Sequence, residues 1–279
     1  MTITTADGLI DAMANNNTRI IVDKPNFANT SVGNYFSYWR ITGQPGQATL
    51  PTTTVETLDN TSIGCINFAD QTSPTTSYLG LLELSTSTAA TTLEIHDRLI
   101  QRGGLVGNST ALQTTNVDLT AVVGNNLVNR IGNPDYSDVQ WWLEWYTDTG
   151  ATVSNAQISV TYNDNTTGTL NPVAVGSTVR AGRMIGLNNL IPAANAGKYI
   201  DAVNSVQLTA STGTAGSFGI TATRYRTSVY TPVNSARVTA NYINLGLPEI
   251  YNGSCLFPVV IAAGAAIPFL KVSGKIIHG

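Results

Sequence analysis

The chain has 279 residues, which is enough for one large domain or two ordinary ones with a core that needs no disulfide or metal. Charged residues make up 11% and hydrophobic residues 42%, so the chain lacks the composition of a disordered protein. The net charge is −3 and no basic run or stripe occurs, which argues against direct nucleic-acid binding. Low charge together with many threonines favours a protein that buries surface against copies of itself or a partner.

The first helical signal lies at residues 5–14. Thr4 or Thr5 can cap a helix there, and apolar residues recur at helical spacing until three asparagines stop the pattern. The segment lacks the basic start of a secretory signal peptide. We therefore expect one short N-terminal helix and no leader.

After this helix the pattern is almost wholly β. The strand candidates are short, rich in β-branched and aromatic residues, and separated by turn signals. Frequent turns without long helical periodicity predict an all-β fold, β-sandwich or jelly-roll-like, with an N-terminal arm that contains the short helix. The candidates are residues 19–23, 35–42, 62–68, 77–84, 91–100, 116–123, 139–146, 151–164, 203–211, 217–226 and 236–245.

We expect three parts along the chain. Residues 1–34 form the N-terminal arm, and residues 35–231 form the β-sandwich domain. Residues 232–279 form a C-terminal β segment that packs on the sandwich or on a neighbouring subunit. The apolar stretch 255–270 is too short for a membrane helix and is interrupted by two prolines and a glycine, so buried strands are expected there.

Residues 139–146 read VQWWLEWY and hold three of the four tryptophans of the chain. We predict that this stretch forms a hairpin with residues 151–164, which alternate apolar and polar side chains. Strand alternation gives the first arm an apolar face, predicted to be core, and an amphipathic face, predicted to be a subunit interface. The apolar face holds Trp141, Leu143 and Trp145, and the candidate interface face holds Trp142, Glu144 and Tyr146.

No catalytic constellation stands out. His96 is followed by Asp97, but neighbours in a strand point to opposite faces and would not pair. His278 is the penultimate residue, and no Gly-x-Ser-x-Gly motif occurs. Glu144 lies among tryptophans, a setting that can raise the pKa of a carboxyl, and aromatic rings stack on sugars. A glycosidase or a sugar-binding protein therefore stays an alternative, although no catalytic residue is assigned.

Metal and cofactor sites have no support from spacing. No Cys-x-x-Cys or His-x-x-x-His pattern occurs, and the sequence NDN at 163–165 lacks the glutamate that closes a calcium loop, so a turn is expected there. Cys65 and Cys255 lie far apart in the sequence and are expected to be two thiols. We expect no bound metal and no cofactor.

Several motifs, taken in order, resemble a run found in virion structural proteins of tailed bacteriophages. They cover most of the chain from about residue 35 onward, and an apolar run that contains Cys255 near the C-terminus completes the likeness. The motifs are YWRITGQPG, LEIHDRLIQRGGLVG, WWLEWYTDTGATVSNAQISVTYND, VRAGRMIGL and VNSVQLTASTGTAGSFGITATR.

The resemblance implies a particle component without an active site, most simply a capsid decoration (cement) protein that binds the major capsid protein. It implies a location on the phage particle, which is assembled in the host cytoplasm, and no membrane or direct nucleic-acid partner. Decoration proteins often sit at symmetry axes, so a homotrimer is expected. Residues 1–34 would then reach a neighbouring subunit. The alternative is a glycan- or receptor-binding module of a tail fibre or spike.

Overall fold

The computed structural model describes residues 3–29, 32–120, 124, 126–213, 216–261 and 266–279. The chain divides into two compact units, each of which is built mainly from antiparallel strands. The predicted all-β, sandwich-like fold class with a short N-terminal helix is confirmed. Unit 1 comprises Met1–Thr49, Leu58–Asp97 and Tyr225–Gly279, and unit 2 comprises Leu50–Thr57 and Arg98–Arg224.

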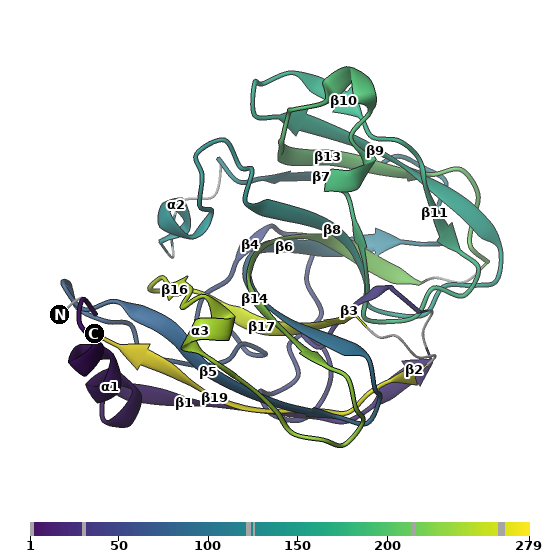
Figure 1. Ribbon diagram of the computed structural model, residues 1–279. Coiled ribbons are helices and arrows are strands. Elements are labelled where there is room, and N and C mark those ends of the chain that lie inside the picture. Colours follow the sequence, from purple (N-terminus) through teal and green to yellow (C-terminus); the bar gives the residue numbers. More distant parts are fainter. Residues whose placement is uncertain (1–2, 30–31, 121–123, 125, 214–215, 262–265) are drawn as a thin grey trace. The chain divides into compact units, whose positions relative to one another are not determined.

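Unit 1 contains two main sheets. In the first, the strand order is β1-β19-β5-β15, and β16 also pairs with β5; Figure 1 shows β1, β19 and β5 side by side. In the second, β17 lies between β3 and the first part of β6. A small two-stranded sheet joins β18 to β2. The elements are α1 (Ala6–Ala14), β1 (Asn17–Lys24), β2 (Phe27–Asn29), β3 (Tyr35–Ser37), β5 (Ser77–Thr86), β6 (Thr91–Val106, to Asp97), β14 (Ser217–Thr231, from Tyr225), β15 (Val238–Asn241), α3 (Tyr242–Leu245), β16 (Glu249–Ile250), β17 (Leu256–Ile261), β18 (Ala266–Ile267) and β19 (Leu270–His278).

The helix α1 follows its sequence signals. The Thr5 hydroxyl accepts a hydrogen bond from the Gly8 N–H at 3.1 Å and so caps the first turn. At the other end the Asn15 N–H donates to the Asp11 carbonyl before the chain turns into β1. Capping by Thr5 confirms one of the two predicted alternatives.

The predicted arm at residues 1–34 is wrong for β1. This strand pairs antiparallel with β19 over its whole length, from Asn17↔Ile277 to Lys24↔Leu270. Its alternate residues Ile20 and Val22 enter the core of unit 1, whereas Ile21 is 47% exposed. The alternating pattern predicted the strand but could not reveal that its partner lies at the other end of the chain.

The core of unit 1 lies between its two sheets. Side chains from β1, β5 and β19 pack with side chains from β3, β6 and β17, which is the arrangement of a sandwich. The predicted C-terminal segment 232–279 supplies β17 and β19 to these two sheets and so is an integral part of unit 1. Representative buried members are Phe36, Leu82, Leu84, Leu93, Ile95, Val260, Val272 and Ile276.

Unit 2 is also a sandwich of two sheets. In one sheet the order is β10-β9-β13-β7, and β11 also pairs with β9; in the other, β8 lies between β14 and β12. The strand β4 pairs with the second part of β6. The elements are β4 (Glu56–Thr57), β6 from Arg98, β7 (Gln113–Asp118), α2 (Leu127–Arg130), β8 (Val139–Trp145), β9 (Val153–Tyr162), β10 (Thr167–Thr169), β11 (Val173–Gly176), β12 (Arg183–Gly186), η1 (Asn188–Leu190), η2 (Ala193–Asn195), β13 (Ile200–Leu208) and β14 to Arg224.

The predicted hairpin between residues 139–146 and 151–164 is wrong. The first arm, β8, pairs with β12 and β14, whereas the second arm, β9, pairs with β10, β11 and β13. The two arms lie in opposite sheets of unit 2, and their apolar faces meet in its core. Period-two alternation predicts that a segment is a strand with one buried face, but it does not identify the hydrogen-bonded neighbour.

The single sandwich predicted at 35–231 is likewise corrected. Two of the unit boundaries fall inside strands, between Asp97 and Arg98 in β6 and between Arg224 and Tyr225 in β14. The other two, at residues 49–50 and 57–58, enclose the short segment Leu50–Thr57 that belongs to unit 2. A boundary inside a continuous strand carries no proline, glycine or polar linker, so composition could not mark it.

Other predicted strands differ in extent. Residues 62–68 contain one isolated bridge, Ile66↔Leu256, because hydrogen bonds from the Ser62 and Cys65 N–H groups fold this segment into turns. The strand predicted at 35–42 ends at Ser37. In the strand predicted at 116–123, residues 121–123 lie outside the described part of the chain.

The apolar stretch 255–270 forms the buried strand β17 and the start of β19, as expected, while residues 262–265 lie outside the described part. Among the described residues, none of the helices has the length and apolar character needed to span a bilayer.

The packing of β14 on β6 in unit 2 gives a testable prediction. A Cβ atom at Gly219 would overlap the Arg102 carbonyl oxygen and lie 2.6 Å from the Tyr146 hydroxyl oxygen. We expect Gly219→Ala to lower the free energy of unfolding by about 1–3 kcal/mol, as overpacking does. Gly186→Ala is the matched control, because its nearest neighbour, the Trp142 ring, lies at an ordinary 3.5 Å. Urea unfolding followed by tryptophan fluorescence should separate the two variants, and equal midpoints would contradict the overlap.

Candidate functional site

The apolar face that strand alternation predicted for the aromatic strand β8 is confirmed. Trp141, Leu143 and Trp145 are fully buried in the core of unit 2. The Trp145 ring stacks on Phe218 with a centroid distance of 4.3 Å, and the Trp141 indole N–H donates to the Ile200 carbonyl at 2.8 Å. These side chains hold the sandwich together.

The candidate interface face is also buried, which corrects the exposure that the sequence predicted for it. Trp142, Glu144 and Tyr146 are 4%, 1% and 7% exposed. The Trp142 indole N–H donates to the Thr223 hydroxyl at 2.9 Å. An amphipathic face resembles a subunit interface in sequence, but here the polar partners come from the same chain. These three side chains are therefore enclosed by their own chain and form no contact surface on it.

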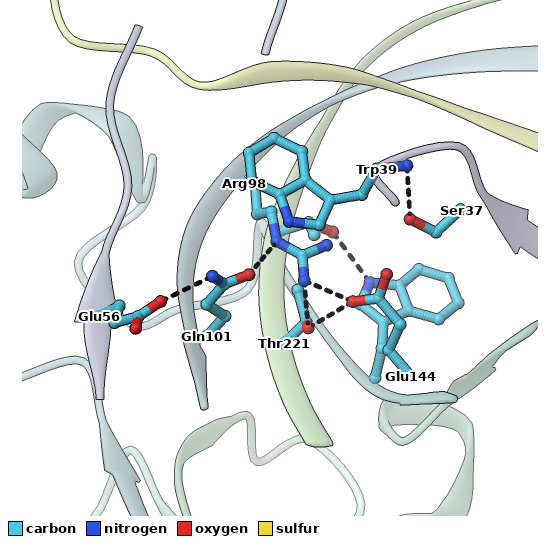
Figure 2. A network of polar contacts seen from close by, with 9 residues as sticks. Ser37, Trp39, Glu56, Arg98, Gln101, Glu144 and Thr221 are labelled. Carbon is cyan, nitrogen blue, oxygen red and sulfur yellow. Dashed lines mark hydrogen bonds and ion pairs between the residues drawn. The ribbon is translucent and has the colours of Figure 1, made fainter. Parts of the chain in front are cut away.

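Glu144 is the centre of a buried polar network in unit 2, shown in Figure 2. Arg98, at the start of the second part of β6, donates through Nη2 to Glu144 Oε2 at 2.5 Å. The Thr221 hydroxyl, on β14, donates to the same oxygen at 2.8 Å and accepts from Arg98 Nη2 at 3.0 Å. Arg98 and Glu144 are 0% and 1% exposed, so the ion pair lies in a region of low dielectric.

The network continues from Arg98 toward the surface. Arg98 Nε donates to Gln101 Oε1 at 2.8 Å, and Gln101 Nε2 donates to Glu56 Oε2 at 2.8 Å (Figure 2). Arg98 compensates the negative charge of Glu144, and the hydrogen bonds among Arg98, Glu144 and Thr221 link β6, β8 and β14. Because Glu144 is paired and enclosed, it presents no accessible carboxyl to a sugar, and the reading of Glu144 as a glycosidase acid is not supported by its surroundings.

The two histidines lie in unit 1 and are both buried. His96 Nε2 lies 2.8 Å from Glu94 Oε2, on the same face of β6, while the Asp97 carboxylate accepts from the Cys255 N–H at 2.8 Å. His96 and Asp97 therefore use different partners, as strand alternation predicted.

His278 forms a pairing that the sequence could not suggest, because its partner is a strand neighbour distant in sequence. His278 Nδ1 lies 2.9 Å from the Ser77 hydroxyl, and Nε2 lies 2.9 Å from the Thr18 hydroxyl. A serine–histidine pair is the start of a nucleophilic site, but here a threonine occupies the place of the orienting carboxylate. Ser77 is 1% exposed, and burial lowers the pKa of His278, so the pair is a closed structural contact.

The sequence NDN at 163–165 forms the β9–β10 hairpin turn, as expected. The Asp164 carboxylate pairs with Lys198 Nζ at 2.8 Å and accepts from Thr166. These contacts hold the pKa of Asp164 at about 2. Within the described residues, no group of three or more His, Cys, Asp or Glu side chains could hold a metal ion.

Both cysteines are thiols, as the sequence predicted, and the structure places both in the interior. Cys65 donates to the Asn60 carbonyl at 3.0 Å, and Cys255 is 0% exposed. We expect a thiol reagent such as Ellman's reagent to label neither cysteine in the native protein and both after denaturation. Fast labelling of a native thiol would show that its segment opens.

Two surface hollows lie on the units. In unit 1, a hollow of about 340 Å³ on the outer face of the β1-β19-β5 sheet is lined by Ile21, Glu83 and Lys271 among others. In unit 2, a hollow of about 450 Å³ is lined by polar side chains such as Gln140 and Lys198, by Tyr199 and by apolar residues such as Ile191. Both volumes are in the range of small-ligand sites.

Comparisons with known proteins give no family. No protein-family model matches the chain, and no curated protein matches it. Solved structures that align with it include the infectious bursal disease virus Gx strain, at 13% identity over 94% of this chain and 81% of that chain, with a TM-score of 0.17. The VP2 subviral particle of the same virus aligns at 10% identity over 95% and 82%, also at 0.17. Its T=1 particles align at 12% identity over 95% and 78%, again at 0.17. These neighbours are viral particle proteins, but TM-scores this low do not establish a shared fold.

Proposed function

We propose that this protein is a structural, non-enzymatic component of a tailed-phage particle. The observation that carries the proposal is the ordered series of motifs, from residue 38 to Cys255, that resembles virion structural proteins. In support, these motifs supply strands and turns of the two units, and their polar side chains, such as Glu144 and Arg98, are used in internal contacts.

The more specific role that we propose is a capsid decoration (cement) protein. Such a protein binds across neighbouring major capsid protein subunits at the particle surface and stabilises the shell by burying apolar area at roughly 25 cal/mol per Å². Few charges and many β-branched residues suit repeated contact with a shell. A homotrimer matches a symmetry axis of such a shell.

The test is the composition and imaging of purified particles. Mass spectrometry should find the protein in a high and regular copy number, and electron cryo-microscopy should place it on the outer surface of the head. Light scattering of the isolated protein should give three times the chain mass. Absence from particles would reject the virion role. Presence in the tail would reject the decoration role while keeping the virion role.

A second candidate is a glycan- or receptor-binding module, and the hollow in unit 2 favours it. Its lining places the Ser137 hydroxyl and the Gln140 amide near the Tyr199 ring, with the Lys198 side chain also present. A hydroxyl and an amide beside an aromatic ring are suited to sugar hydroxyls and a sugar face. Trp142 is buried, so Tyr199→Ala is the variant to test on a glycan array. Saturable binding that this variant loses while staying folded would favour the second candidate.

A further inference from the structure

A β-bulge in unit 2 places Asp201 beside the end of β7, where Asp118 lies, and the Leu119 N–H donates to the Asp201 backbone carbonyl at 3.4 Å. The pairing of β13 with β9 passes from Ile200↔Tyr162 to Ala202↔Thr161, so Asp201 is the extra residue. On the other side of β13, Ala202 lies opposite Asp118, the last residue of β7. The bulge breaks the alternation of the strand, and Asp201 is only 6% exposed, between two other buried residues. Bulges commonly re-aim a side chain in this way next to functional sites.

The Asp201 carboxyl group is buried with an incomplete set of partners. Tyr136 is its hydrogen-bond partner, but Asp201 Oδ1 is enclosed and has no hydrogen-bond partner in the described part of the chain. A buried carboxylate is normally paired or fully hydrogen-bonded. The ion pairs of unit 2 engage other carboxylates, and no described Lys or Arg pairs with Asp201. Those pairs are Arg98–Glu144, Arg180–Asp148, Lys198–Asp164 and Arg224–Asp138.

The surroundings concentrate negative potential at this point. The Asp118 carboxylate is fixed by hydrogen bonds from the Thr120 N–H and hydroxyl, at 2.7 and 2.6 Å. Tyr136, which contacts Asp201, has a left-handed backbone with φ of 65°. Burial and the neighbouring Asp118 raise the pKa of Asp201 to about 6, and burial and both carboxylates raise the pKa of Tyr136. A cation bound here would reduce the electrostatic repulsion between the Asp118 and Asp201 carboxylates.

We propose that Asp118 and Asp201 bind a hard divalent cation of the Ca²⁺ or Mg²⁺ class, with Asp201 Oδ1 as a ligand. The donors are all oxygens, which these cations prefer, and no nitrogen or sulfur ligand faces the pair among the groups identified around it. Two carboxylates are fewer than a closed protein cage provides, so backbone carbonyls and water complete the coordination, as they do in many sites of this class. Binding ties the end of β7 to the start of β13.

Terbium provides a direct test, because Tb³⁺ replaces Ca²⁺ at oxygen sites and luminesces when an indole or phenol nearby is excited. The Trp141 indole donates to the carbonyl of Ile200, next to Asp201. We expect saturable Tb³⁺ luminescence on tryptophan excitation, displaced by Ca²⁺ or Mg²⁺. Asp201→Asn and Asp118→Asn should each weaken Tb³⁺ binding at least tenfold. Asp164→Asn, which alters an exposed carboxylate, should leave it unchanged.

Two results would overturn the proposal. One is Tb³⁺ luminescence that is absent, unsaturable or equally weakened by Asp164→Asn. The other is a wild-type melting temperature that does not rise with Ca²⁺ or Mg²⁺. In that case the Asp201 carboxyl group binds a proton and no metal ion. The first result includes a folded Asp201→Asn variant that still binds Tb³⁺ as tightly as the wild type. Circular dichroism shows whether each variant is folded, and asparagine is close in shape to aspartate.

Discussion

Replacing Glu144 by Gln should lower the free energy of unfolding of unit 2 by about 3–5 kcal/mol, because it leaves the Arg98 guanidinium buried without its counter-charge. Glutamine keeps the shape of the side chain, so the change tests the charge and not the packing. Three of the four tryptophans lie in unit 2, and their fluorescence during guanidinium unfolding reports on this unit. The midpoint should fall with little change in slope.

Two further variants separate the pair from the rest of the network. Glu56→Gln alters the outer end, where the carboxylate is partly exposed, and should cost far less. The double variant Arg98→Met with Glu144→Leu removes both charges and should recover most of the loss. If Glu144→Gln cost no more than Glu56→Gln, the buried Arg98 charge would not depend on Glu144 for its compensation.

Asp201→Asn should raise the free energy of unfolding by up to about 3 kcal/mol at pH 8 in the presence of EDTA. The pKa of Asp201 is raised from 3.8 to about 6 in the folded chain, and each pKa unit corresponds to about 1.4 kcal/mol. A raised carboxyl pKa means that the folded state holds the proton more tightly than the unfolded state. The stability from this group is therefore full below about pH 4 and is lost as the pH rises through 6.

The measurement is urea unfolding of the wild type and Asp201→Asn between pH 4 and pH 8, with EDTA throughout. The two curves should nearly coincide at pH 4, diverge between pH 4 and pH 6, and keep a constant separation above that, with the variant more stable. Asp164→Asn is the control of opposite sign, since the pKa of Asp164 is lowered by Lys198 and Thr166. A constant difference between Asp201→Asn and the wild type across this range would show that Asp201 keeps its ordinary pKa.

Local properties of the fold could be predicted from the sequence, but pairings between distant segments could not. Thr5 and the asparagines bound α1, and alternation placed Trp141, Leu143 and Trp145 in a core. Each of these depends on residues close together in the chain. By contrast, the partner of β1 is β19, and β8 and β9 belong to different sheets, which a period of two residues does not determine.

The polar contacts could not be predicted for the same reason, because their partners are distant in the sequence. Glu144 and Arg98 are separated by 46 positions, and Ser77 and His278 by 201, so neither pair has a sequence signature. Asp201 escaped prediction for another reason: it enters the interior only because a bulge breaks the alternation of β13. Consecutive buried positions from Ile200 to Val203 are the trace of that bulge, and in sequence they look like an ordinary strand.

The discontinuous make-up of unit 1 has a consequence for synthesis on the ribosome. Unit 2 is complete once Arg224 has emerged, whereas the central strand of the first sheet of unit 1, β19, is made last. Until then β1 and β5 have no strand between them, and their apolar faces are uncovered. Unit 2 can therefore fold first, during translation, while unit 1 waits until β19 has emerged. The slow, aggregation-sensitive step then belongs to the long-range strand pairing of unit 1.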